Sequence, residues 1–491
     1  MPEVRCHFFS VIMKTFKSIW YIIAAFFFSA LNMIKDLKLQ NLPSASALIG
    51  LGIFFAVILI FFIFHLLRWW RTKIYIEEDT LVIARNQLSQ SKTTVKLSSI
   101  STVNLQQNLF ERIFDVYSLQ LDINSSVTAD KTDFNLIFDD QLAFAFKDYI
   151  LAYINEPSQE RTASLEHKSE VIKSDPAAEE DIISFRFKDV ILHCILSFSI
   201  AGFISTIALI CAVIWSFNND NPEISRMIIP TLLSIGVATI PLIYKSITAF
   251  FLYYDFTLKK SGDKVLVSYG LFTRRQFTLP LDKTNALVIK QPLQARFFNL
   301  AYGEIINIGL GDAANHQAPL FCLLVKPEVL QHVIHQIAPE FVLDKIPEHS
   351  PKTALIPTFI PWAFFGILAV IGFTVFFKGW IGWLILVFFS LCAYFSSITK
   401  ALTLYEDKIS ITTGIFQKRT ITVFYGKIQN MSVRYGPISH KLGLYKGNVS
   451  ILSSVANKIN AIGYFPKERF QAIETQIISH DSFAAQYQQH Q

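Results

Sequence analysis

The chain has 491 residues, of which 52% are hydrophobic and only 17% are charged, whereas soluble domains average about 25% charged residues. This balance points to a protein embedded in lipid. The formal net charge of +6 is too small to attract anionic partners through a whole-molecule field, so we expect no nucleic-acid partner. None of the five cysteines forms a C-x-x-C pair, which argues against a disulfide framework or a zinc site and predicts reduced thiols.

Apolar blocks of membrane-spanning length occur six times along the chain. Each is close to the roughly 20 residues that a helix needs to cross a bilayer. They are residues 18–34, 47–67, 190–217, 227–253, 354–376 and 380–399. Short connectors join them in pairs, which predicts three transmembrane hairpins over 18–67, 190–253 and 354–399. The first block could also be a signal peptide, but no small-residue cleavage site follows it, so we interpret it as a span.

Basic residues near the ends of these blocks predict the orientation. The connectors within the hairpins carry few lysines and arginines, and the opposite side carries many more. Arg68, Arg71 and Lys73, interleaved with Trp69 and Trp70, are typical of an interfacial anchor. We therefore expect both termini and all large hydrophilic domains to be cytoplasmic.

After each hairpin the pattern changes to alternating apolar and polar residues, which is typical of strands. The segment from Gly270 to Thr278 aligns without gaps on the segment from Gly414 to Thr422, and each has a glycine, two apolar residues and a pair of bases. Glycine followed by such a run indicates a turn that leads into a strand. This repetition predicts domains at 68–155, 254–338 and 400–479, a flexible linker at 156–181 and a polar tail at 480–491.

A second segment recurs after each set of strands. It begins at Gln107, Gln291 and Gly436, and its second residue is an asparagine in the first copy and Pro292 or Pro437 in the others. A base follows four residues later as Arg112, Arg296 or Lys441, and the third copy is one residue shorter. Each copy then closes with an amphipathic helical pattern at 140–154, 327–337 or 466–478. The predicted repeat is thus a hairpin, strands and a closing helix.

These segments, in this order and in three copies, resemble the bacterial membrane-anchored pleckstrin-homology-like (PH-like) domain family. The resemblance covers nearly the whole chain. It implies a multi-pass α-helical membrane protein with three cytoplasmic PH-like β-sandwich domains, each closed by a C-terminal helix. It also implies a partner, namely a smaller single-domain PH-like membrane protein. The first copy departs from the pattern, with Asn86, Gln87 and Leu88 where the others have glycine and apolar residues.

Motifs for catalysis are weak. Gly309 begins a G-x-G-x-x-A match, but Pro319 follows too soon for the helix that a dinucleotide site needs, so a hairpin loop is favoured. His332 and His335 have metal-compatible spacing without further ligands, and we interpret them as surface or half-buried residues. We therefore expect no enzyme, no cofactor and no metal. The predicted spans also have essentially no ionisable residues at their centres, which disfavours transport.

The best binding candidates are the bases of the two glycine turns, Arg274, Arg275, Lys418 and Arg419. Such clusters are most often solvated faces, although juxtamembrane bases can also form a surface that binds anionic lipid or a partner. We expect a non-enzymatic scaffold of the bacterial cytoplasmic membrane whose three modules bind a partner protein, each other or lipid headgroups, with self-association of the chain as a further alternative. The alternative is an accessory component of a transporter or channel.

Overall fold

In the computed structural model of the protein, twelve segments are described. They are residues 3–19, 45–77, 79–86, 90–123, 134–155, 180–197, 244–262, 264–281, 284–307, 320–377, 382–451 and 458–489. The chain divides into two compact units. The first contains the first repeat together with Phe272–Phe277, and the second contains the third repeat and the rest of the second repeat.

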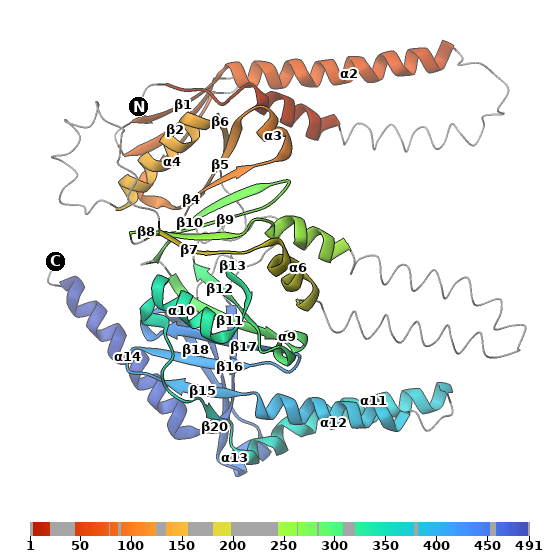
Figure 1. Cartoon of the computed structure of the whole chain (residues 1–491), viewed down its shortest axis with the longest axis vertical. Helices are drawn as coiled ribbons and strands as arrows, with labels where there is room; N and C mark the ends of the chain where they lie inside the picture. The colour runs from red at the N-terminus through yellow and green to blue at the C-terminus, as the bar shows by residue number, and fades with distance from the viewer. Residues whose placement is uncertain are drawn as a thin grey trace, which may run out of the picture. The chain divides into compact units, whose positions relative to one another are not determined.

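The first repeat folds into antiparallel strands covered by a helix (Figure 1). Strands β1, β2 and β3 pair in that order, as do β4, β5 and β6, and α4 contacts β4 and β5. The elements are β1 (Thr72–Glu77), β2 (Thr80–Asn86), β3 (Gln90–Lys96), β4 (Ile100–Gln107), α3 (Leu109–Ile113), β5 (Val116–Ile123), β6 (Phe134–Asp139) and α4 (Asp140–Asn155). This is the predicted arrangement of strands followed by a closing helix.

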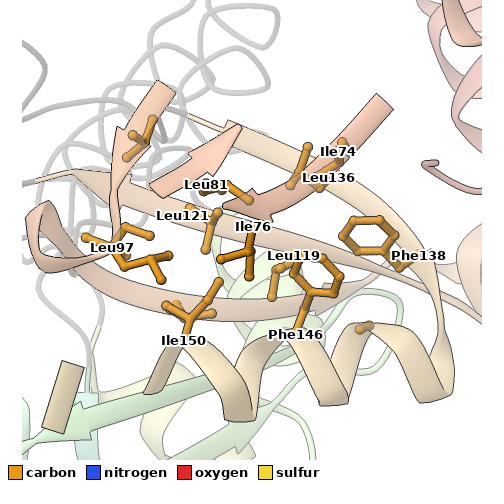
Figure 2. Packing of buried hydrophobic residues seen from close by; sticks show 14 of the residues in the cluster. Ile74, Ile76, Leu81, Leu97, Leu119, Leu121, Leu136, Phe138, Phe146 and Ile150 are labelled. Carbon is orange, nitrogen blue, oxygen red and sulfur yellow. The ribbon is translucent and has the colours of Figure 1, made fainter. Parts of the chain in front are cut away.

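The core of the first repeat lies between the strands and α4 (Figure 2). Alternation along the strands turns Leu119 and Leu121 to one face, because successive strand side chains point to opposite sides. Helix α4 brings Phe146 and Ile150 against that face, and the rings of Phe138 and Phe146 stack at 5.0 Å. Burying one such side chain contributes about 1.5–3 kcal/mol, so this cluster holds the helix on the sheet.

The second repeat has the same order of elements. They are β7 (Glu180–Ser184), α6 (Phe187–Leu196), β8 (Thr257–Ser261), β9 (Lys264–Tyr269), β10 (Arg274–Pro280), β11 (Thr284–Pro292), α9 (Leu293–Phe297), β12 (Ala301–Asn307), β13 (Leu320–Val325) and α10 (Pro327–Ile337). Proline at the first turn of α10 suits a helix start, where its missing N–H leaves no bond unmade.

The third repeat follows the same plan. Its elements are β14 (Glu348–His349), α11 (Leu355–Phe377), α12 (Gly382–Ile398), β15 (Ala401–Leu404), β16 (Lys408–Thr413), β17 (Gln417–Phe424), β18 (Ile428–Arg434), α13 (Pro437–Lys441), β19 (Leu444–Ile451), β20 (Lys458–Pro466) and α14 (Lys467–Gln489). Strands β18, β19 and β20 form a separate sheet in that order.

The structure adds a piece that the sequence did not reveal, a short edge segment before each predicted hairpin. Val4 bridges Ile74 of β1, β7 pairs with β8, and β14 pairs with β15. Glu180 and Asp181, placed in the linker by sequence, therefore belong to β7, while the rest of that linker lies outside the described residues. Helix α14 continues through residues assigned to the polar tail, as far as Gln489.

Among the described residues, two helices are long and apolar enough to cross a membrane, at Gly52–Trp70 within α2 (Ala45–Trp70) and at Lys352–Ile371. Helix α12 carries a shorter apolar stretch and lies beside α11 (Figure 1). Phe364 and Leu368 are exposed, as suits side chains that face lipid. The predicted spans at 18–34, 190–217 and 227–253 lie wholly or largely outside the described residues.

Candidate functional site

The basic turn of the second repeat leads into a strand that pairs with the first repeat. Residues Arg274–Gln276 of β10 run antiparallel to the end of β4, with Arg274 opposite Gln107 and Arg275 opposite Gln106. These residues of β10 belong to the first compact unit. We call this ladder the first joint.

The basic turn of the third repeat makes the same ladder with the second repeat, which we call the second joint. Strand β17 runs antiparallel to β11, with Lys418 opposite Gln291 and Arg419 opposite Lys290. The two joints have the same register, because each pair of bases faces the last residues before the short helix α3 or α9. A hydrophobic core also spans the second joint, because Val288 of β11 packs in one cluster with Ile421 and Val423 of β17.

A glycine begins each of these turns, and its backbone conformation explains why glycine occupies this position. Gly270 has φ +117° and Gly414 has φ +115°, values that favour glycine because a side chain would clash with the backbone. A Cβ atom on Gly414 would lie 1.8 Å from the carbonyl oxygen of Gln417. The turn that aims the basic strand at the previous repeat therefore depends on this residue type.

The second recurring segment lies at the same joints. In the second joint, Arg296 of α9 donates from Nη1 to the carbonyl oxygen of Ile415 in the glycine turn, at 3.3 Å. In the first joint, the hydroxyl of Thr273 donates to Oδ1 of Asn108, at 3.1 Å. Pro292 is the N-cap of α9 and pairs with Gln417. The two sequence motifs are thus two sides of one contact between successive repeats.

The structure aligns the short helices without a gap. Asn108, Pro292 and Gly436 are the N-caps of α3, α9 and α13. Seven residues after each N-cap the backbone has positive φ, at Asp115, Asn299 and Gly443. The third copy is therefore not one residue shorter. His440 occupies the position of Arg112 and Arg296, and Pro437 and Lys441 each lie one residue beyond the positions expected from sequence.

Two cations and one carboxylate meet in the second joint. Lys290 Nζ lies 2.5 Å from Glu304 Oε1, with side chains 18% and 8% exposed. Burial lowers the pKa of Arg419, and the nearby Glu304 and Tyr302 partly offset this. The Nε and Nη2 atoms of Arg419 are buried without a hydrogen-bond partner among the described residues. Glu304 is therefore the group that balances both cations.

The phenol of Tyr302 completes this polar cluster. Burial, together with the charge of Glu304, raises the pKa of Tyr302, and Gln417 Nε2 donates to its hydroxyl at 2.9 Å. Burial and the charge of Arg296 lower the pKa of Lys418. The second joint is thus a desolvated polar contact.

Of the four candidate bases, Arg274 is exposed and Arg275, Lys418 and Arg419 are half-buried. All four bases stand in ladders between successive repeats, a place that the sequence-based interpretations, a solvated face or a surface for lipid or a partner, did not specify. One sequence signal could have shown it. The glycine and the bases occur only in the two repeats that have a repeat before them, and the first repeat has Asn86 at the glycine position.

The structure places the two histidine candidates but not the glycine motif. His332 and His335 are exposed on α10, and the Gly309 motif lies outside the described residues. Among the described residues there is no group of three or more potential metal ligands. A cavity of about 20 Å³ between Cys6, His65 and Trp69 is about the size needed for one water molecule.

Comparisons with known proteins agree with the threefold repeat. The bacterial PH domain family model matches residues 23–159, 191–337 and 356–480. The UPF0699 transmembrane protein YdbT of Bacillus subtilis (strain 168) is 23% identical over 408 residues, which cover 79% of this chain and 81% of YdbT. No solved structure matches. These findings confirm the resemblance inferred from the repeated segments.

Proposed function

Because the chain belongs to the bacterial PH domain family, we propose that it is a non-enzymatic scaffold of the bacterial cytoplasmic membrane. In this proposal its three PH-like modules, which are the three repeats, present binding surfaces for a partner protein or for lipid headgroups. The membrane association agrees with the name of its relative, a transmembrane protein.

The observation that carries this proposal is the use of the repeated motifs. Gly270, Gly414 and Arg296 serve contacts between successive repeats, and the described residues contain no group of three or more potential metal ligands. A chain whose most regular features join its own modules is suited to holding several binding surfaces together. Tethered surfaces raise effective concentration, so weak contacts add up to useful avidity.

The proposed topology has six spans in three hairpins, with both termini and all three modules in the cytoplasm. The basic residues beside the spans support this orientation. A reporter that is active only outside the cytoplasm should work when inserted at 35–44 and should be silent after Gln491. Activity at the C-terminus would instead mean an odd number of spans.

The proposed protein partner is a smaller membrane protein with a single PH-like domain. Affinity purification of the tagged chain from membranes in mild detergent, followed by mass spectrometry, tests this directly. Enrichment of such a protein over an unrelated six-span control would support the proposal. Recovery of the chain with neither protein nor specific lipid would contradict it.

Binding of anionic lipid by the basic turns is a separate part of the proposal. Changing Arg274, Arg275, Lys418 and Arg419 to Ser should reduce the anionic lipid that co-purifies, more at low salt than at high salt, since salt screens exposed charges. Three of these bases are half-buried, so the variant's unfolding temperature must be measured alongside. Unchanged lipid content in a folded variant would contradict lipid binding.

An accessory role in a transporter or channel is the alternative. Ion or solute pathways usually place ionisable side chains inside the bilayer. Helices α11 and α12 contain no Asp, Glu, Lys, Arg or His. The described part of the third hairpin therefore favours an anchoring role.

A further inference from the structure

The joints account for only some of the strand edges that the three repeats offer. Each joint uses one strand from each of two successive repeats, so three repeats leave one such strand over at each end. In the described part of the chain, these are β3, at the edge of the sheet β1-β2-β3, and β18, at the edge of the sheet β18-β19-β20. β18 corresponds to β4 and β11, and β3 corresponds to β10 and β17.

The outer side of β18 is exposed where its counterparts are covered. Leu105 and Gln107 in the first joint are 1% and 5% exposed, whereas the equivalent Val433 and Tyr435 are 41% and 59% exposed. An unpaired edge of this kind is a template for another strand. Edge strands are often protected from pairing by lysine, proline or a β-bulge. β18 has no lysine or proline. Its register irregularity near Ile428 does not prevent pairing, because β4 and β11 have the same irregularity and do pair.

The charges beside β18 restrict which strand can pair with it. Arg434 takes the position of Lys290, but Asn448 takes the position of Glu304, and Lys446 is opposite Arg434. A strand with two bases, like β10 or β17, would bring a further cation to Arg434 without the carboxylate that balances the second joint. Like charges placed directly opposite each other destabilise a strand pair.

The strand β3 meets this restriction. Gln90 and Ser91 stand at the positions that Arg274 and Arg275 hold in β10, because the hairpins β2-β3 and β16-β17 have the same register. We propose that β3 of a second copy of this chain pairs antiparallel with β18, so that chains join head to tail. In the register of the two joints, Ser91 of one copy lies opposite Arg434 of the other, and Lys92 lies opposite Val433.

This inference deepens the proposed scaffold function and rests on it, because it names one partner and the surface that receives it. The contact is heterologous, since different surfaces of the two copies meet. Repeated heterologous contacts generate a ring if the rotation between successive copies closes, and an open filament if it does not. The membrane-anchored chain therefore gains an array longer than three modules.

Disulfide cross-linking in native membranes tests the pairing. The five native cysteines are replaced by Ala, and two differently tagged chains are co-expressed, one with Val433→Cys and the other with Lys92→Cys. Mild oxidation should give a product that carries both tags, at twice the 55.9 kDa of one chain. The matched control replaces Lys92→Cys by Thr93→Cys, because adjacent strand residues point to opposite faces.

A positive control tests whether mild oxidation forms a disulfide between strands paired in this register. Ile289→Cys and Thr420→Cys in one chain stand at the corresponding pair of the second joint and should cross-link. If they do and the two tagged chains do not, the head-to-tail pairing is wrong. A product of Val433→Cys with another, smaller protein would also overturn it, but would leave the scaffold function standing. Equal yields from Lys92→Cys and Thr93→Cys would mean random collision and would likewise contradict the pairing.

Discussion

The two joints share a backbone ladder but differ in the polar pair beside it. In the first joint, Gln120 Nε2 donates to Gln106 Oε1 at 2.6 Å. In the second, the same two positions hold Glu304 and Lys290, which form an ion pair. The ladder and the glycine turn are therefore sufficient to define the joint. Both incoming strands carry an arginine beside this pair, Arg275 or Arg419, so a neutral pair and a balanced ion pair both accept a base.

The largest loss of stability should come from removing the carboxylate of the ion pair between Lys290 and Glu304. Glu304→Gln leaves the half-buried Lys290 and Arg419 without a counter-charge, which should cost about 3 kcal/mol of unfolding free energy, the low end of the range for a broken buried pair. Thermal unfolding of the full chain in mild detergent measures it. Lys290→Met is the matched control and should cost much less, because Glu304 and Arg419 then balance each other. Equal losses in the two variants would contradict this account of the cluster.

The second-largest loss of stability should come from a substitution in the glycine turn. Gly414→Ala forces a Cβ into the carbonyl of Gln417 and strains a left-handed backbone, at about 1–3 kcal/mol. Gly426→Ala is the control, since a Cβ there meets nothing within 4 Å. Similar unfolding temperatures for the two alanine variants would show that the turn is not strained as described. Gly270→Ala should act in the same way on the first joint.

Exchanging the polar pair between the joints should have an intermediate effect. Gln106→Lys alone places a cation opposite Arg275, whereas adding Gln120→Glu recreates the ion pair of the second joint. The double variant should recover stability, with a coupling energy of about 0.5–3 kcal/mol. A double-mutant cycle on unfolding temperatures measures it, and strictly additive losses would contradict the equivalence of the two sites.

The smallest expected effect is a pH dependence of stability that comes from Glu111, a position at which the two joints also differ. Glu111 of α3 is 1% exposed, where α9 has Ala295. Burial raises the pKa of Glu111 above its ordinary value of 4.5, although bonds from the Asn108 amide and the Ser118 hydroxyl partly oppose this. The folded state then binds the proton more tightly than the unfolded state, so stability falls as pH rises from about 4.5 through the raised pKa.

Glu111→Gln should remove this pH dependence. The test compares unfolding temperatures of the native chain and of the variant across the mildly acidic range. Parallel pH profiles for the two proteins would mean that Glu111 does not titrate in this way.

Local patterns were enough to predict the repeats. Alternating residues such as Ile74 and Ile76 indicated strands, helical spacing indicated α4, α10 and α14, and the recurrence of Gly270 and Gly414 indicated equivalent turns. These features depend on the period of the chain and on backbone sterics, which act over a few residues. For the same reason the bacterial PH domain family could be identified before any contact was known.

Tertiary structure alone decided which strand edges meet. Sequence marked Arg275 and Arg419 as bases in a turn, but their environment depends on Gln106 and Lys290, which lie more than 100 residues earlier in the chain. A strand can pair along either edge, and its own side chains do not specify a distant partner. Sequence therefore determined that the chain has three similar modules, and only the folded structure determined that their recurring motifs join one module to the next.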